Sequence, residues 1–193
     1  MNFGKLSVVA FVAAAMSIGT VAAAQTSAAA PVAPPPPPEI EVGQVAPDFT
    51  IEVADSAGIR STPVKLSDLR GKVVVLAFYP ADKSSGCTFQ LTKFRDDYAT
   101  IFGPETVVLP VSVDSLGTHA SWAAEMKFPF ALGTDTELTL AKQYGSFIPG
   151  RRTSTRTVFV IGKDGRILWR NLRFPALNEG AYTELAAEVA KAR

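Results

Sequence analysis

Cysteine and histidine are almost missing from this chain: its 193 residues include one cysteine, Cys87, and one histidine, His119. A lone cysteine cannot form a disulfide bond within its own chain. One thiol and one imidazole are also too few to supply the protein ligands of a zinc or copper site. The sequence therefore excludes a disulfide-stapled scaffold and predicts neither a metal nor another cofactor.

A surplus of charge of either sign is absent as well. The chain carries 19 Lys and Arg against 18 Asp and Glu, and the first 38 residues hold one cation, Lys5, and no acid. From residue 39 onward the two signs balance, and no run of Lys or Arg occurs. Surfaces that bind nucleic acid need a basic surplus. We therefore expect no nucleic acid among the partners.

The first 24 residues have the pattern of an export signal. Lys5 precedes an apolar stretch that ends in Ala22-Ala23-Ala24, which is the layout of a secretory signal peptide with a small-residue cleavage site. The alternative is an uncleaved anchor, because residues 6–24 approach the ~20 apolar residues that span a bilayer. The sequence predicts a periplasmic or secreted protein, tethered to the membrane only if this segment is retained.

An Ala- and Pro-rich linker is predicted over residues 25–42. It contains Pro34 to Pro38, and consecutive prolines favour an extended polyproline II conformation. The remaining residues, 43–193, have the length of one ordinary domain with a single core.

The first half of this domain predicts a strand, a helix and a parallel strand. The continuous apolar run Lys72–Tyr79 is typical of a central strand that is buried on both faces. After Cys87, one helix face is formed by Leu91, Phe94, Tyr98, Ile101 and Phe102. A second strand follows over Thr106–Val113, and a right-handed crossover makes the two strands parallel.

The second half predicts two helices, a hairpin and a final helix. Thr118–Lys127 forms a short helix, and Thr134–Glu137 has the spacing of a capping box that opens another. Thr155–Ile161 and Arg166–Leu172 are joined by a short loop that contains Asp-Gly, which indicates an antiparallel hairpin. A C-terminal helix carries the apolar stripe Tyr182, Leu185, Ala186 and Val189. This order predicts an α/β thioredoxin fold with a central mixed sheet flanked by helices.

Cys87 is the leading candidate for chemistry because of its place between the first strand and its helix. Sites in such sheets form at the carboxyl ends of strands, and helix-end amides favour the thiolate, which is the nucleophilic form. Arg156 opens a strand of the same sheet and is the leading candidate for a cation beside the thiol. Ser84 offers a hydroxyl, and Pro80 ends the strand where it would shield the thiolate from water. The predicted catalytic residues are Cys87, Ser84, Arg156 and Pro80.

At these residues the sequence resembles the peroxiredoxins, and especially their bacterioferritin-comigratory branch. The pattern Pro-x-x-x-Thr/Ser-x-x-Cys is met by Pro80, Ser84 and Cys87. Further matching segments are Gly43–Phe49, Gly86–Gln90, Phe94–Asp96, Val111–Ser115, His119, Phe128–Phe130 and Arg156–Ile161. The resemblance covers nearly all of residues 43–193.

The resemblance implies a thiol peroxidase that reduces hydrogen peroxide or organic hydroperoxides. Cys87 would attack the terminal peroxide oxygen and become a sulfenic acid. Ser84 would hydrogen-bond the peroxide, Arg156 would hold the thiolate and stabilise charge on the leaving oxygen, and Pro80 would shape the pocket.

Two positions depart from this family. Ser84 stands where Thr is usual, which keeps the hydroxyl but loses the methyl group that restricts its rotamer. Thr92 stands where many members of the branch carry a second cysteine. The implied mechanism is therefore one-cysteine, with an external thiol or a thioredoxin-like protein as reductant, and further oxidation of Cys87 becomes a risk. From the same resemblance we expect a monomer or weak dimer.

Two other functions compete with a peroxidase. One is an envelope thiol-disulfide oxidoreductase or copper-delivery protein, which needs a cysteine pair; Gln90 and Leu91 occupy the positions of the second cysteine. The other is a redoxin interaction domain without catalysis. His119 falls in the first turn of a predicted helix, where we expect a solvated side chain without a direct role.

Overall fold

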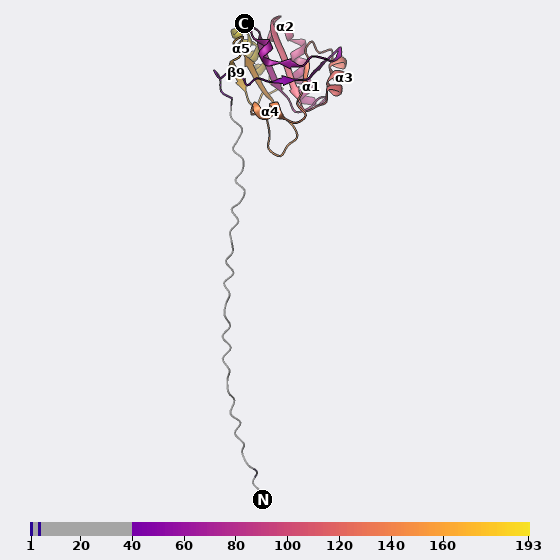
Figure 1. The fold of residues 1–193 in the computed structure, drawn as a ribbon, viewed down its shortest axis with the longest axis vertical. Helices are drawn as coiled ribbons and strands as arrows, with labels where there is room; N and C mark the ends of the chain where they lie inside the picture. The colour runs from indigo at the N-terminus through magenta and orange to yellow at the C-terminus, as the bar shows by residue number, and fades with distance from the viewer. Residues whose placement is uncertain (2–3, 5–39) are drawn as a thin grey trace. The chain divides into compact units, whose positions relative to one another are not determined.

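A mixed sheet built around strand β5 (Val73–Phe78) forms the centre of the folded unit (Figure 1). This computed structural model describes residues 1, 4 and 40–193. The expected signal peptide and most of the expected linker lie outside the described residues. All of β5 is buried, as its apolar run predicts. It pairs in parallel with β6 (Thr106–Ser112) and antiparallel with β8 (Thr157–Ile161).

Further strands extend this sheet on both sides. β8 forms the predicted hairpin with β9 (Ile167–Asn171), while β6 pairs in parallel with β7 (Leu132–Thr134). β2 (Val53–Asp55) and β3 (Gly58–Ile59) complete the other edge. Within residues 40–193 the order is β3-β2-β7-β6-β5-β8-β9, with a separate pair β1 (Thr50–Ile51) and β4 (Val64–Lys65). This mixed sheet flanked by helices confirms the predicted thioredoxin-like α/β fold.

The helices follow the predicted order, with boundaries set by local chemistry. After the 3-10 turn Leu66–Leu69 come α1 (Ser85–Asp96), α2 (Tyr98–Ile101), α3 (Leu116–Met126), α4 (Thr139–Gln143) and α5 (Glu179–Ala192). The single helix expected after Cys87 is interrupted at Asp97, which separates α1 from α2. The Ser115 hydroxyl caps α3 by accepting a hydrogen bond from the Thr118 N–H at 3.3 Å.

The expected capping box at Thr134–Glu137 is wrong. Thr134 is the last residue of β7, a strand that the sequence did not predict. The Asp135 carboxylate instead accepts the backbone N–H groups of Leu140 at 3.1 Å and Ala141 at 2.8 Å. It thereby satisfies amides that the first turn of α4 leaves without helical partners.

Alternate residues of β5 divide the apolar core into two layers. Val73, Val75 and Ala77, together with Tyr79 directly after the strand, pack with Cys87 and with side chains of α1, α2, α3 and α5. Val74, Leu76 and Phe78 pack on the opposite face with Tyr144 and with side chains of β1, β2 and α4. This division follows from the two-residue period of a strand. Cys87 therefore belongs to the layer that α1 and α5 cover.

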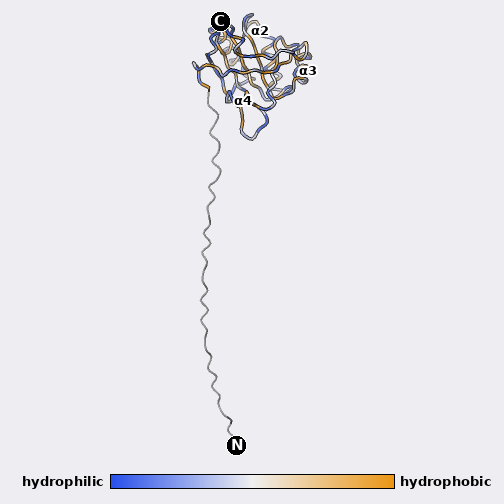
Figure 2. The backbone as a smooth tube through the Cα atoms, in the orientation of Figure 1, coloured by the Kyte–Doolittle hydropathy of each residue, from blue (hydrophilic) through white to orange (hydrophobic). Residues whose placement is uncertain are grey.

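The hydropathy of the backbone follows this layering (Figure 2). Hydrophobic colour runs through strands in the interior, and the loop that projects beside α4 changes from hydrophobic to hydrophilic colour along its length. Among residues 1, 4 and 40–193, no helix combines the length and the apolar character that a membrane crossing requires.

Candidate active site

Cys87 lies in the first turn of α1. Helix α1 begins at Ser85 after the N-cap residue Ser84, and the Thr88 N–H donates to the Ser84 carbonyl at 2.8 Å. The thiol is therefore the third helical residue, inside the helix rather than directly before it as the sequence suggested. This position exposes the sulfur to the positive end of the helix dipole, which favours a thiolate.

Arg156 is brought onto Cys87 by the pairing of β5 with β8. Phe78 lies opposite Thr157, so Arg156 immediately precedes β8 beside the carboxyl end of β5. Its Nη2 donates to the Cys87 Sγ at 3.3 Å. This contact is the ion-pairing geometry of a thiolate with a guanidinium, and the sequence predicted its two residues.

Gly86 gives the guanidinium room to approach the sulfur. A Cβ atom at this position would lie 3.2 Å from Arg156 Nη2, which is tighter than an ordinary van der Waals contact. Gly86 therefore avoids a tight contact that any side chain at this position would make with Arg156.

Gln90 is a site residue that the sequence analysis did not single out. Its Oε1 accepts a hydrogen bond from Arg156 Nη1, so the two arms of one guanidinium contact Cys87 and Gln90. Gln90 is completely buried, and in the part of the chain that the structure describes its Nε2 has no hydrogen-bond partner. The signal in the sequence was a polar residue three positions after Cys87, on the same side of the helix.

The segment from Pro80 to Ser84 connects β5 to the helix and is fixed at its start. The Pro80 carbonyl accepts from the Thr153 hydroxyl at 2.6 Å, and the Tyr79 carbonyl accepts from the Ser154 hydroxyl at 2.8 Å. Ser84 is exposed, and its hydroxyl donates to the Ala81 carbonyl at 3.1 Å. Its oxygen lone pairs therefore remain able to accept a hydrogen bond from a ligand.

The expectation that the His119 side chain is solvated was wrong. Its side chain has no exposed surface, and Nδ1 lies 2.8 Å from Oδ2 of Asp82, whose side chain is also buried. The other ring nitrogen, Nε2, lies 3.1 Å from the Gly133 carbonyl oxygen. The prediction of solvation used only the place of His119 in the first turn of a helix. That place carries no information about β7, which brings Gly133 against the ring.

Two buried phenols lie close to this region. Burial raises the pKa of Tyr79 well above its usual value, and the neighbouring Asp82 charge adds to this shift. Burial also raises the pKa of Tyr182, against the opposing effect of the Arg156 guanidinium. Both phenols are therefore neutral hydrogen-bond donors at physiological pH, and Tyr79 donates to Asp82 Oδ1 at 2.6 Å.

Burial of Cys87 does not make it an ordinary core residue. The residue has no exposed surface, which on its own favours an inert thiol. A guanidinium directly on the sulfur opposes that interpretation, because placing a cation against a neutral apolar group gains little and costs desolvation. The contact with Arg156 places a cation where it would stabilise a thiolate.

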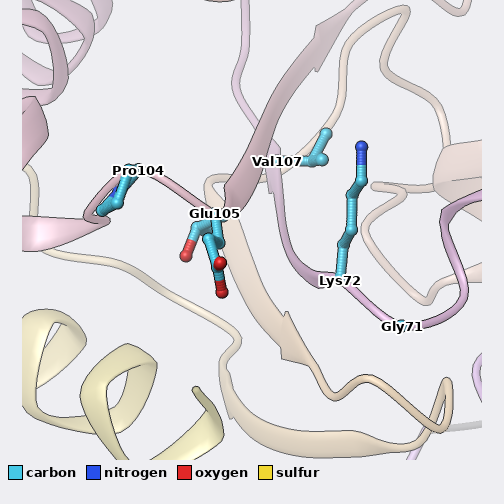
Figure 3. Close-up of a pocket in the computed structure, with 6 residues that line it drawn as sticks. Gly71, Lys72, Pro104, Glu105 and Val107 are labelled. Atoms are coloured by element: carbon cyan, nitrogen blue, oxygen red, sulfur yellow. The ribbon is translucent and has the colours of Figure 1, made fainter.

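The hollow in Figure 3 belongs to a different part of the sheet. It has a volume of about 420 Å³ and is lined by Gly71, Lys72 and residues 104–107, before β5 and at the start of β6. None of the predicted catalytic residues lines it. Within the described residues, no group of three or more His, Cys, Asp or Glu side chains is placed to hold a metal ion.

Together the fold and the site define a class: a thioredoxin-fold protein with one thiol at a helix start, paired with an arginine from the neighbouring strand. Comparisons with known proteins agree. The pattern of the AhpC/TSA family matches residues 42–170. The chain is 37% identical over 134 residues to a putative peroxiredoxin Bcp of Coxiella burnetii, covering 66% of this chain and 85% of the relative.

Further relatives support the same assignment. Identity is 36% over 145 residues to peroxiredoxin Bcp of Bacillus subtilis, with 69% of this chain and 87% of that protein covered. The crystal structure of peroxidoxin BcpB from Mycobacterium tuberculosis superposes with a TM-score of 0.67 at 27% identity, covering 80% of this chain and 99% of that one. The chain belongs to the AhpC/TSA family and is a peroxiredoxin similar to the Bcp proteins, with a single cysteine.

Proposed function

We propose that this thiol-dependent peroxidase reduces hydrogen peroxide or organic hydroperoxides at Cys87, with Arg156, Ser84 and Pro80 completing the catalytic site. The observation that carries the assignment of the site is the contact of Arg156 Nη2 with Cys87 Sγ at 3.3 Å. Family membership supports the type of reaction, and this contact supports the assignment of Cys87 and Arg156 as the groups that perform it.

The first half-reaction transfers one oxygen atom to sulfur. The Cys87 thiolate attacks the terminal peroxide oxygen, so that an S–O bond forms while the O–O bond breaks. The leaving alkoxide or hydroxide takes up a proton, and Cys87 becomes a sulfenic acid. Arg156 supplies positive charge in the buried site, where it stabilises both the thiolate and the negative charge that develops on the leaving oxygen.

Ser84 and Pro80 take supporting parts in this proposal. The Ser84 hydroxyl proton is directed to the Ala81 carbonyl, which leaves its oxygen free to accept a hydrogen bond from the peroxide. Pro80 follows the end of β5, where its carbonyl is held by Thr153. Its fixed backbone angle restricts the segment that leads to Cys87.

The second half-reaction needs a reductant from outside the chain. The sequence holds no cysteine besides Cys87, and Thr92 stands five residues further along α1. An external thiol would attack the sulfenic acid, releasing water and forming a mixed disulfide, and a second thiol would restore Cys87. We propose a small thiol or a thioredoxin-like protein for this role.

We further propose that the protein is exported and acts as a monomer or weak dimer. The support for export is the pattern of residues 1–24, with Lys5 before an apolar stretch and an Ala-rich end. Mass measurement of the mature protein tests it: loss of the first 24 residues is expected, and an intact N-terminus in the membrane fraction would contradict cleavage.

Peroxide consumption with dithiothreitol as reductant tests the peroxidase site. Wild type and the control Thr92→Ser, which trims a side chain on the same helix, should consume peroxide at similar rates. Cys87→Ser should fall to the rate of dithiothreitol alone. If wild type is no faster than Cys87→Ser, the proposed function fails.

The one-cysteine cycle has its own measurement. Brief treatment with one equivalent of peroxide followed by glutathione should give a mixed disulfide on Cys87, seen by mass spectrometry. Excess peroxide without a thiol should give sulfinic acid at the same residue. A protein that gives neither product does not follow this cycle.

A further inference from the structure

The buried pair of Asp82 and His119 takes no part in the proposed chemistry, although Asp82 lies five residues before Cys87. Oδ2 of Asp82 is 2.8 Å from Nδ1 of His119, and the exposed fractions of the two side chains are 1% and 0%. Charged or chargeable groups are seldom buried unless they are paired. The burial of this pair therefore raises the question of which part of the structure the two side chains keep in place.

The hydrogen bonds of the ring fix the number of protons on the pair. Nε2 faces the Gly133 carbonyl at 3.1 Å, and a carbonyl only accepts, so Nε2 carries a proton. Nδ1 faces a carboxylate oxygen, and a bond forms there only if a proton lies between the two atoms. Both contacts together require one proton at Nε2 and one between Nδ1 and Asp82 Oδ2. Because a carboxylic acid is ordinarily a stronger acid than an imidazolium, we place the second proton on Nδ1, which makes His119 an imidazolium opposite an ionised Asp82.

The second carboxylate oxygen agrees with this assignment. Tyr79 donates its phenolic proton to Asp82 Oδ1 at 2.6 Å, and the raised pKa of this phenol keeps the proton in place. Asp82 thus accepts from two side chains, one on each oxygen, as an ionised carboxylate does. Loss of the proton at Nδ1 would leave the buried Asp82 carboxylate facing the lone pair of His119 Nδ1, which is a repulsive contact.

Asp82 fixes the segment that leads to Cys87. Its backbone N–H donates to Asp114 Oδ2 at 2.7 Å, while its side chain reaches Tyr79 and His119. The next residue, Lys83, has a φ of 58°, in the left-handed region that residues with a side chain rarely adopt. Such a conformation persists where the surrounding contacts over-determine it, and the contacts of Asp82 do so here.

The acidic groups on the neighbouring elements have hydrogen-bond or ion-pair partners of their own. Asp114, after β6, accepts from the Ser112 hydroxyl as well as from Asp82, and β7 presents the Gly133 carbonyl. On β2, Asp55 is bonded to Arg60. On α3 itself, Glu125 pairs at the surface with Lys83 at 3.1 Å.

We propose that His119, as a buried imidazolium bonded to Asp82, is a positioning residue that holds the Pro80–Gly86 segment in the conformation in which Cys87 reacts. The proposal rests on the proposed function for its peroxide readout. The bridging proton is the element that links pH to the shape of this segment. His119 touches neither the sulfur nor the peroxide and acts only through Asp82.

Spectroscopy tests the proton count without any activity. His119 is the only histidine of the sequence, so a two-bond ¹H–¹⁵N spectrum contains one set of ring signals. At pH 7 the folded protein should show both nitrogens in the protonated form. A ring with one protonated and one bare nitrogen would overturn the proposal, whatever the protein does with peroxide.

The variant Asp82→Asn gives a test in which the pH dependence of Cys87 reactivity, relative to wild type, is reversed. The asparagine oxygen still accepts from Tyr79, and its NH₂ group donates to a bare Nδ1, so a neutral ring completes every bond. An imidazolium would meet the NH₂ group without an acceptor. The variant therefore keeps the segment when His119 is neutral and loses it when His119 is protonated, the reverse of wild type.

The readout is the ratio of the Asp82→Asn rate to the wild-type rate, for Cys87 oxidation by peroxide and for Cys87 alkylation by iodoacetamide. The ratio cancels the titration of the thiol itself. It should rise about tenfold or more from the most acidic to the most alkaline pH at which both proteins stay folded, because the two proteins need opposite charge states of His119. The control Glu125→Gln, which breaks only the surface pair with Lys83, should give a flat ratio.

A flat ratio for Asp82→Asn in both reactions would overturn the proposal. His119→Gln should slow both reactions about tenfold, because one amide cannot satisfy Asp82 and Gly133 together. If that variant fails to fold, the Asp82→Asn ratio and the ring spectrum still decide. If wild type consumes no peroxide, the proposed function fails, while alkylation and the spectrum continue to test the role of His119.

Discussion

The two ends of strand β5 offer opposite combinations of space and chemistry. At the amino end, Lys72 and Glu105 line an open hollow of about 420 Å³ (Figure 3). At the carboxyl end, Cys87 is fully buried, yet it contacts a guanidinium and lies in the first turn of a helix. A nucleophile needs partners that stabilise its charge more than it needs an existing cavity. Polar contacts therefore point to the candidate active site of this protein, and the size of a hollow does not.

The same comparison bears on how a peroxide reaches the thiol. Since Cys87 has no exposed surface, its sulfur becomes accessible only when neighbouring atoms move. The bonds of Asp82 and Pro80 tie the segment next to this buried thiol to its surroundings.

The largest effect after loss of the thiol is expected at Arg156. Arg156→Ala should lower the rate of Cys87 oxidation about 100-fold or more, as removal of one donor from a preorganised anion site does. Arg156→Lys should fall between alanine and wild type, because an ammonium lacks the planar fork that contacts Cys87 and Gln90 together. Stopped-flow measurement of sulfenic acid formation gives the rates.

The control for this prediction is Arg60→Ala. Arg60 forms an exposed ion pair with Asp55 and carries the same charge away from the thiol. It should retain the wild-type rate. If Arg60→Ala and Arg156→Ala slow the reaction equally, net charge rather than the contact with Cys87 explains the effect. The proposal that local polar contacts determine reactivity at the carboxyl end of β5 is then contradicted.

A smaller effect is expected at Gln90. Gln90→Met keeps the length of the side chain and removes the acceptor for Arg156 Nη1. Loss of a hydrogen bond to a charged group costs about 1.5 kcal/mol, which corresponds to about tenfold in rate if it acts wholly through positioning. The same peroxide assay measures it. Gln143→Met, an equal change at an exposed glutamine near Asp48, should leave the rate unchanged.

Much of this end of the molecule could be predicted from sequence because it depends on local pattern. The apolar run before Pro80, the helix stripe after Cys87 and the Asp-Gly loop of the hairpin each predict an element from neighbouring residues alone. Arg156 was found because it opens a strand that the hairpin places in the same sheet. The β5–β8 pairing then brings it to the sulfur.

The remaining features depend on contacts between distant segments. His119 is buried because β7 and Asp82 come to it from 14 and 37 residues away, and no pattern around position 119 carries that information. The short strands β1, β2 and β7 have at most three residues each, too few for a period to emerge. Asp135 caps α4 from outside the helix, which displaced the expected capping box.

The smallest effect is expected at the amino end of β5. Lys72→Ala and Glu105→Gln change exposed side chains at the hollow, far along the strand from Cys87. Surface substitutions of this kind usually alter the free energy of unfolding by about 0.5 kcal/mol or less, so urea unfolding should show no larger shift. The rate of Cys87 oxidation should stay within about twofold of wild type, because the sulfur, Arg156 and Gln90 keep their contacts. A tenfold loss in either variant, with unfolding unchanged, would mean that the hollow takes part in catalysis and that the two ends of β5 act together.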